Sequence, residues 1–306
     1  MTRPGAIVTD RDRAILRSVA DYRLLTTEQL QRLHFPSAQT TLRRLRRLEE
    51  AGLLLRQRSD ALPTQVVSLT GMGASTLRDG DAAGMEVSTG RQRPMRLPGP
   101  YFLKHLVEVN DFRIALELEA RQRPDLTLLG VLADTNRTAS GPSAQPRSEL
   151  SESVTFEGEA GERIAHTPDL AFGLRRDERQ ALFLAEIDRG TEVVGDPKRG
   201  VGLFVRFYLR ALVTGAFREI GAKLGGAEGF RGFRVLVVTT SPARVDAVRA
   251  RWGTMPTDPD VAKHFIWLTT RDALRGRSLL EHEWVSLDPR DETRYVAAAR
   301  REERVP

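Results

Sequence analysis

The chain has 306 residues, enough for two domains of ordinary size, and a net charge of +6. It contains no cysteine, which excludes disulfide bonds and cysteine-ligated metal sites, and no apolar run long enough to span a membrane. Because the first residues also lack the apolar stretch of a signal peptide, we expect a cytoplasmic protein. Residues 1–70 hold 12 Arg and no Lys against 7 Asp or Glu, which favours nucleic acid as the partner of this region.

The N-terminal region begins with two short predicted helices. Apolar residues at helical spacing predict a first helix over Asp10–Tyr22, capped by Thr9 or Asp10. A second helix is predicted over Thr27–His34, with Thr27 as its cap. A turn over residues 35–37 then leads into the stretch around which we expect this domain to be built.

That stretch, Ser37–Gly52, predicts a third helix with two different faces. Leu42, Leu45 and Leu48 recur every third residue and are expected to form one buried stripe. Ser37 is a favourable N-cap, and a helix commonly ends at a glycine such as the last residue of the stretch. A solvated charged helix without a partner is the plainer interpretation. Arginines fill the positions between the leucines, and we expect them to lie in solvent and bind DNA: Arg43, Arg44, Arg46 and Arg47.

Two short strands, Leu53–Arg58 and Val66–Thr70, are expected to form a hairpin after this helix. The order predicts a winged helix-turn-helix domain over residues 1–78, closed by a helix over Gly71–Arg78. In such domains the second helix of the motif enters the major groove of double-stranded DNA. Arg56 and Arg58 on the wing extend the surface that is expected to contact phosphates. Because only one module is visible, tight binding is expected to require a homodimer or a further protein.

The rest of the chain predicts a linker over residues 79–100, a second domain over residues 101–290 and a tail over residues 291–306. Residues 134–163 are predicted to form a long loop or insertion. The order of elements indicates an α/β fold with a mixed sheet between helices, and it resembles the core of the PD-(D/E)xK nuclease fold. The predicted elements are a helix over Phe102–Arg121, strands over Leu126–Ala133, Ile164–Leu174 and Gln180–Asp188, a helix over Lys198–Phe217, a strand over Phe233–Thr240, a helix over Ser241–Trp252 and a strand over His264–Leu268.

Three carboxylates on two adjacent strands are the candidate catalytic and metal-binding residues. If the turn between the strands is centred on residues 177–178, Asp169 lies directly opposite Glu186, at a Cβ separation of about 5 Å. Asp188 lies two residues further on and shares the face of Glu186. Three carboxylates on one face repel one another unless a cation lies among them, and Mg²⁺ or Mn²⁺ is the expected ion. The alternative is a set of solvated carboxylates, or an ion pair with Arg189.

The pattern departs from the nuclease signature at one position. The usual motif ends in a lysine that positions and activates the attacking water, and Asp188 stands in that place here. Lys198, near the start of the next predicted helix, either reaches back into the site as a catalytic residue or lies on the surface. Glu149 is either a fourth carboxylate of the site or an ordinary loop residue.

Three parts of the sequence together resemble the replication-relaxation family, whose members occur on plasmids and integrative elements. They are the predicted winged helix, the segment HLVEVNDFRIAL and the run PDLAF…LAEIDRGTE…K, of which EIDRGTE is the most specific part. The resemblance covers most of residues 9–215. It implies binding to the DNA of an origin or mobile element during replication or relaxation of that DNA, with replication or conjugation proteins as partners.

Two functions remain open for the second domain. It is either a metal-dependent nickase or endonuclease that the winged helix directs to DNA, or part of a non-catalytic transcriptional regulator. In the second case a degenerate nuclease fold dimerises or binds another protein, and the missing lysine favours this alternative.

Overall fold

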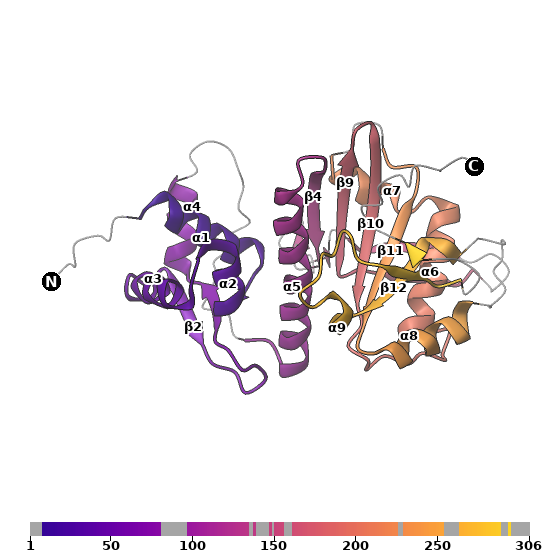
Figure 1. Cartoon of the computed structure of the whole chain (residues 1–306), viewed down its shortest axis with the longest axis horizontal. Helices are drawn as coiled ribbons and strands as arrows, with labels where there is room; N and C mark the ends of the chain where they lie inside the picture. The colour runs from indigo at the N-terminus through magenta and orange to yellow at the C-terminus, as the bar shows by residue number, and fades with distance from the viewer. Residues whose placement is uncertain are drawn as a thin grey trace, which may run out of the picture. The chain divides into compact units, whose positions relative to one another are not determined.

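The computed structural model describes residues 8–80, 97–134, 137–138, 147–148, 150–155, 161–225, 229–253, 263–288 and 293–294 (Figure 1). The chain divides into two compact units, Met1–Ile114 (unit 1) and Ala115–Pro306 (unit 2). Each unit contains helices and a β-sheet of its own, so the fold is α/β as predicted. Among the described helices, none combines the length and the apolar character needed to cross a membrane.

Unit 1 contains helices and a three-stranded sheet in the predicted order, with one additional strand. The strands are antiparallel, in the order β1-β3-β2. The elements are α1 (Asp10–Asp21), β1 (Leu25–Thr26), α2 (Thr27–His34), α3 (Ala38–Glu50), β2 (Leu54–Gln57), β3 (Val66–Leu69), α4 (Gly71–Gly80) and α5 (Pro100–Gln122), which continues past the end of the unit. The additional strand, β1, has only two residues, too few to produce a detectable alternation.

Side-chain caps determine where the first three helices begin. Thr9 caps α1 and Ser37 caps α3, as predicted, and each hydroxyl accepts a hydrogen bond from a backbone N–H of the first turn. The cap of α2 is Thr26 rather than the predicted Thr27. Thr26 is also the last residue of β1, so its extended backbone serves both the strand and the helix start.

The buried face of α3 differs from the predicted leucine stripe. Leu45 and Leu48 are buried, but Leu42 is 46% exposed, and Thr41 takes the inward position instead. An α-helix turns by about 100° per residue, so positions spaced by three drift around its axis by about 60° at each step. Leu42 therefore falls at the edge of the solvent face, and the prediction that it is buried is wrong.

The first half of α5 packs within unit 1. Asn110 is buried, and its amide donates a hydrogen bond to the backbone carbonyl oxygen of Leu24 at 2.7 Å. A buried cluster joins the same half of the helix to the rest of the unit: Leu24, Val66, Leu103 and Leu106. Unit 1 thus ends inside α5, at Ile114, rather than at the predicted linker, of which residues 81–96 lie outside the described residues.

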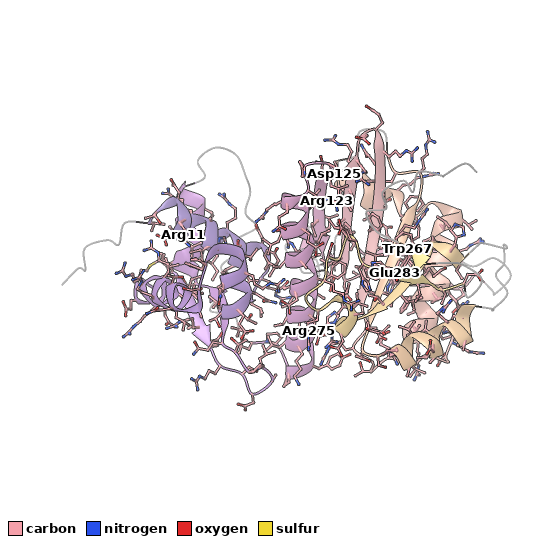
Figure 2. The ribbon with its side chains drawn as sticks, in the orientation of Figure 1. Arg11, Arg123, Asp125, Trp267, Arg275 and Glu283 are labelled. Carbon is pink, nitrogen blue, oxygen red and sulfur yellow. The ribbon has the colours of Figure 1, made fainter. Side chains whose placement is uncertain are left out.

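The second half of α5 belongs to unit 2. Glu119 accepts hydrogen bonds from the backbone N–H groups of Leu279 (2.8 Å) and Leu280 (3.1 Å). Just after the helix, Arg123 lies 2.8 Å from Asp125 (Figure 2) and also forms an ion pair with a glutamate far along the chain. These contacts connect the start of the unit to its C-terminal part.

Unit 2 is built on a seven-stranded mixed sheet in the order β14-β13-β12-β11-β10-β9-β4. The central strands β10, β11 and β12 are parallel, and the other neighbours are antiparallel. The strands are β4 (Thr127–Ala133), β9 (Leu170–Arg176), β10 (Arg179–Ile187), β11 (Phe233–Thr239), β12 (Ile266–Thr270), β13 (Trp284–Ser286) and β14 (Thr293–Arg294). The helices are α6 (Gly200–Thr214), α7 (Arg218–Lys223), α8 (Pro242–Val248) and α9 (Arg271–Leu274), with a π-helical turn η1 (Arg249–Gly253) after α8 and a 3₁₀ turn η2 (Lys263–Phe265) before β12.

Parts of unit 2 differ from the sequence prediction. The segment predicted as a long loop contains two pairs of short antiparallel strands. They are β5 (Arg137–Thr138) with β6 (Arg147–Ser148), and β7 (Glu152–Thr155) with β8 (Arg163–His166). The strand predicted over Ile164–Leu174 is therefore two strands, β8 and β9. They belong to different sheets, and the chain is not in a strand around Pro168, between them. Glu149 lies outside the described residues.

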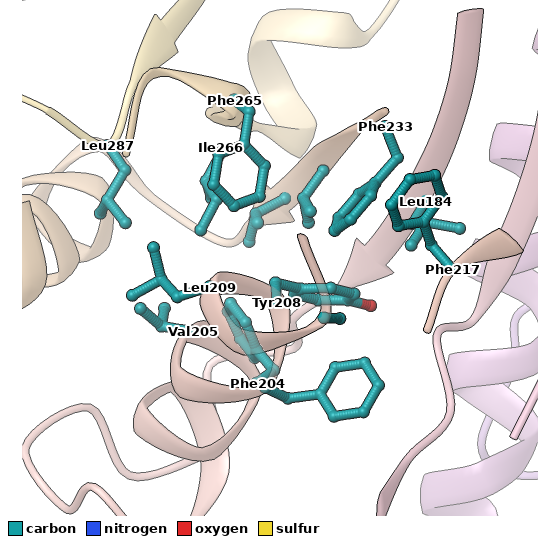
Figure 3. Close-up of a cluster of buried hydrophobic side chains, with 14 of the residues drawn as sticks. Leu184, Phe204, Val205, Tyr208, Leu209, Phe217, Phe233, Phe265, Ile266 and Leu287 are labelled. Atoms are coloured by element: carbon teal, nitrogen blue, oxygen red, sulfur yellow. The ribbon is translucent and has the colours of Figure 1, made fainter. Parts of the chain in front are cut away.

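The core of unit 2 lies between the sheet and helices α6 and α8, which lie on the same face of the sheet (Figure 1). Figure 3 shows the aromatic centre of this core, where the ring centroids of Tyr208 and Phe233 are 5.9 Å apart. Helix α6 approaches η1 so closely that a Cβ atom at Gly202 would lie 2.5 Å from the Trp252 ring. Glycine is thus required where the two helical segments meet.

We expect Leu45→Ala to lower the free energy of opening of α3 by about 2–5 kcal/mol, because it leaves a cavity in the core of unit 1. Leu42→Ala is the matched control on the same helix and should change that energy by less than about 0.5 kcal/mol. Hydrogen exchange of the α3 amides in the full chain measures both. Equal losses for the two variants would contradict the observed orientation of the helix.

Candidate functional site

The predicted DNA-binding arginines fall into two groups. Arg44 and Arg56 are partly buried. The remaining four are exposed: Arg43, Arg46, Arg47 and Arg58. The partners of each group determine which side chains are available to a ligand.

Arg44 holds α3 against α1. Its guanidinium group binds the carboxylate of Asp12, whose side chain is 1% exposed, and lies 3.2 Å from the hydroxyl of Thr9. Burial acts to raise the pKa of Asp12, but the hydrogen bonds from Arg44 and Thr9 outweigh it and lower the pKa below its ordinary value. Removing one partner of a buried ion pair lowers stability, because the other charge is left buried without a partner. Arg44 therefore positions α3 against α1 rather than facing solvent.

Arg56 joins the hairpin to the end of α3. Its Nε lies 2.7 Å from a carboxylate oxygen of Glu49, and its backbone N–H donates to the other oxygen at 3.2 Å. A glutamate near the C-terminus of a helix is disfavoured by the helix dipole. The pair with Arg56 explains why Glu49 is nevertheless placed there.

Between residues 39 and 47, the exposed side chains of α3 are one amide, one apolar side chain and three arginines. We call this surface the α3 face: Gln39, Leu42, Arg43, Arg46 and Arg47. Arg46 forms an exposed pair with Glu50 at 3.1 Å, which contributes little stability. In the part of the chain that the structure describes, no acidic side chain pairs with Arg43 or Arg47, so both guanidinium groups are available to an anionic ligand.

The two strands of the carboxylate hairpin pair in the predicted register. The ladder runs from Arg176 opposite Arg179 to Leu170 opposite Ala185, and Asp169 stands one residue beyond it, next to Glu186. Its carboxylate accepts a hydrogen bond from the backbone N–H of Ile187 at 2.7 Å. The side chain of Asp169 is thus held at the end of the ladder.

Glu186 is buried and bound by two side chains that the sequence pattern did not indicate. His166 Nε2 lies 2.6 Å from its Oε1, and the Tyr208 hydroxyl donates to the same oxygen. Burial raises the pKa of Glu186 despite the opposing effects of His166 and Tyr208. Burial alone would lower the pKa of His166, but the charge and hydrogen bond of Glu186 raise it above its ordinary value. In the sequence, only the position of His166, two residues before the Pro-Asp pair, points to this role.

Asp188 is bound by an arginine, though not by the neighbouring Arg189. The Arg244 guanidinium group, from α8, contacts both carboxylate oxygens of Asp188, one of them at 3.0 Å. The backbone N–H of Gly190 donates to the same carboxylate at 2.8 Å, in a turn where Gly190 has a φ of +76°. Asp188 is therefore neutralised by the protein itself.

Glu192 adds a fourth carboxylate to this region, which we call the carboxylate cluster: Asp169, Glu186, Asp188 and Glu192. Glu192 is exposed, yet desolvation by the surrounding protein and then repulsion from the other three carboxylates raise its pKa. Lys198 does not join the cluster. It is exposed, and among the described residues its ammonium group contacts none of these carboxylates.

Within the described ranges, no group of three or more His, Asp or Glu side chains is arranged so that it could hold a metal ion. Three of the carboxylates already have protein partners. These are the backbone N–H of Ile187 for Asp169, His166 and Tyr208 for Glu186, and Arg244 for Asp188. The metal ligands predicted from the sequence are thus adjacent to one another but already bonded.

The loop after β10 is held in place by the segment α8–η1. Arg244 donates to the backbone carbonyl oxygen of Glu192 at 2.7 Å, and the Trp252 indole N–H donates to that of Val194 at 2.7 Å. A π-helical turn such as η1 is uncommon and often lies near a functional site. These partners lie about 50–60 residues from the loop, and no local motif indicates them.

We expect the free energy of unfolding of unit 2 to fall as the pH rises above about 6.5, the ordinary pKa of histidine. Above that pH the folded His166–Glu186 pair keeps a proton that the unfolded chain has released, so rising pH opposes folding by at most about 1.4 kcal/mol per pH unit. Glu186→Gln removes the charge that holds this proton, and the slope should become shallower. Urea denaturation in EDTA, followed by the fluorescence of Trp252, Trp267 and Trp284, measures unit 2 alone.

Glu178→Gln is the control, because it removes the same charge from an exposed turn of the same hairpin. It should keep the wild-type slope. A Glu186→Gln chain with an unchanged slope would contradict the assignment of the proton to this pair.

The comparisons with known proteins give one match. The family model described as Replication-relaxation matches residues 16–208, a range that includes α3, the hairpin β9–β10 and most of α6. Comparison with curated proteins and with solved structures found no match. Because the matched range covers more than half of the chain, the chain belongs to the Replication-relaxation family.

Proposed function

We propose that this protein binds double-stranded DNA through the α3 face and acts in the replication or relaxation of plasmid or mobile-element DNA. The observation that carries the proposal is the separation of the arginines on α3. Arg44 is bound inward, while Arg43, Arg46 and Arg47 point to solvent on one side of the helix. Family membership supports the replication context.

The order of elements in unit 1 supports a winged helix-turn-helix. Helices α1, α2 and α3 are followed by the hairpin β2–β3, and β1 completes a small antiparallel sheet. In this motif α3 is the helix that enters the major groove, and the hairpin is the wing that lies beside it. Arg58, exposed just after β2, places a cation on the wing.

The exposed arginines fit the phosphates of a duplex. Each phosphate that an arginine neutralises releases a bound counterion, so affinity depends on salt according to the number of contacts. A single α3 offers few such contacts, and two copies on two half-sites would supply the rest. We therefore propose that the protein binds its site as a dimer or together with another replication protein.

Metal-dependent cleavage is a second proposal for unit 2. The register that places Asp169 beside Glu186 favours it, as in the nuclease fold that the order of elements resembles. The bound state of Glu186 and Asp188 opposes it, because His166 and Arg244 take the place of a cation. If unit 2 does not cleave, it serves as an assembly domain for the DNA-binding unit.

Replacing Arg43, Arg46 and Arg47 together by Ala should weaken binding to duplex DNA. It should also reduce the slope of log K against log salt concentration by about 3, since three phosphate contacts are lost. Binding isotherms at several salt concentrations measure both quantities. As a control of equal charge, Arg121, Arg275 (Figure 2) and Arg277 are exposed in unit 2, and their replacement by Ala should leave the slope unchanged. Equal effects of the two triple variants would reject the α3 face as the binding surface.

Cleavage is tested with a supercoiled plasmid that carries a duplex bound by the protein, incubated with Mg²⁺ or Mn²⁺. If unit 2 is a nuclease, nicking should need the ion and be lost in both Asp169→Asn and Glu186→Gln, because each removes one charge of the cluster. Glu178→Gln should nick as the wild type does. Intact plasmid under every divalent ion, with DNA binding retained, would leave assembly as the role of this unit.

A further inference from the structure

The α3 face contains an exposed leucine among its arginines. Leu42 is 46% exposed, although a leucine on the solvent side of a helix gains nothing for the fold. Single exposed apolar residues are ordinary on protein surfaces, so exposure alone carries no function. Leu42 differs from such residues because it lies among arginines. Their positive charge makes an anionic molecule the expected partner of the α3 face.

Gln39 lies beside Leu42 on the same face. It is exposed, and it is the second residue of α3, three positions before Leu42. Residues three apart on a helix have Cβ atoms about 5–6 Å apart. Successive base pairs are stacked about 3.4 Å apart, so two such side chains reach the same pair or adjacent pairs.

The position of these two residues along the helix separates them from two of the arginines. In helix-turn-helix proteins, the N-terminal residues of the recognition helix contact the edges of the bases. Gln39 and Leu42 lie in the first half of α3, whereas Arg46 and Arg47 lie in the second half. A glutamine amide matches the N6 donor and N7 acceptor of adenine, and an apolar side chain matches the C5-methyl group of thymine.

Building on the DNA binding proposed above, we propose that Gln39 and Leu42 select the DNA sequence. Leu42 packs against the methyl group of a thymine in the major groove, and Gln39 binds N6 and N7 of an adenine in the same or the adjacent base pair. Arg46 and Arg47 bind phosphates and supply affinity without sequence preference. The preferred site therefore contains an A·T pair at the place where the start of α3 enters the groove.

The test uses the full chain and a library of random-sequence duplexes, from which the preferred duplex is selected. Each thymine is then replaced by uracil, which lacks only the methyl group, and each adenine by 7-deazaadenine, which lacks only N7. One uracil replacement should weaken wild-type binding about four-fold, the value expected for burial of one methyl group. One 7-deazaadenine replacement nearby should weaken it by roughly five-fold or more.

The variants Leu42→Ala and Gln39→Ala identify the side chain responsible. Leu42→Ala should bind the uracil and thymine duplexes equally well. Gln39→Ala should bind the adenine and 7-deazaadenine duplexes equally well. Both should keep the wild-type salt slope, because neither removes a charge. Met72→Ala is the control, since Met72 is also exposed, at 60%, but lies on α4 outside the α3 face, and it should keep every wild-type preference.

Two results would overturn the inference. One is a Leu42→Ala chain that keeps the wild-type penalty for uracil, and the other is a wild-type chain that no single uracil replacement weakens. In both cases salt-dependent binding to duplex DNA would still support the proposed function. A chain that binds no duplex at any salt concentration would reject the proposed function and this inference with it.

Discussion

Burial of a carboxylate costs several kcal/mol unless a cation or hydrogen-bond donors accompany it, and this constraint organises both units of the protein. In unit 1, Asp12 on α1 is buried and is satisfied by Arg44 on α3. In unit 2, Glu186 and Asp188 lie at the end of a central strand and are satisfied by His166, Tyr208 and Arg244. The buried acids thus decide which basic side chains are used inside the protein and which remain for ligands.

The contrast between two neighbouring arginines shows this effect in unit 1. Arg43 and Arg44 are adjacent in sequence and identical in chemistry, yet Arg44 is bound to a buried acid and Arg43 is exposed. The pair with Asp12 fixes the rotation of α3 about its axis. That rotation brings Leu42 to the surface beside the exposed arginines.

The local sequence predicts where helices begin and how neighbouring strands pair, but it does not predict contacts between distant segments. The starts of α1 and α3 follow from their caps, and the register of β9 with β10 follows from the turn that joins them. The partners of the buried acids cannot be predicted in this way. Asp12 and Arg44 are 32 residues apart, and Asp188 and Arg244 are 56 apart, so only the packed fold brings them together. The strands β5 to β8 are too short to give a periodic signal.

The division of α5 between the two units has a practical consequence for anyone who isolates unit 1 as a separate fragment. A fragment that ended in the Gly- and Pro-rich segment before α5 would appear complete from its sequence. It would, however, lose Leu103 and Leu106, expose Leu24 and Val66 to water, and deprive the backbone carbonyl of Leu24 of its amide donor. A fragment that is to remain folded and soluble must therefore retain α5 at least as far as Ile114, even though its new end then falls inside a helix.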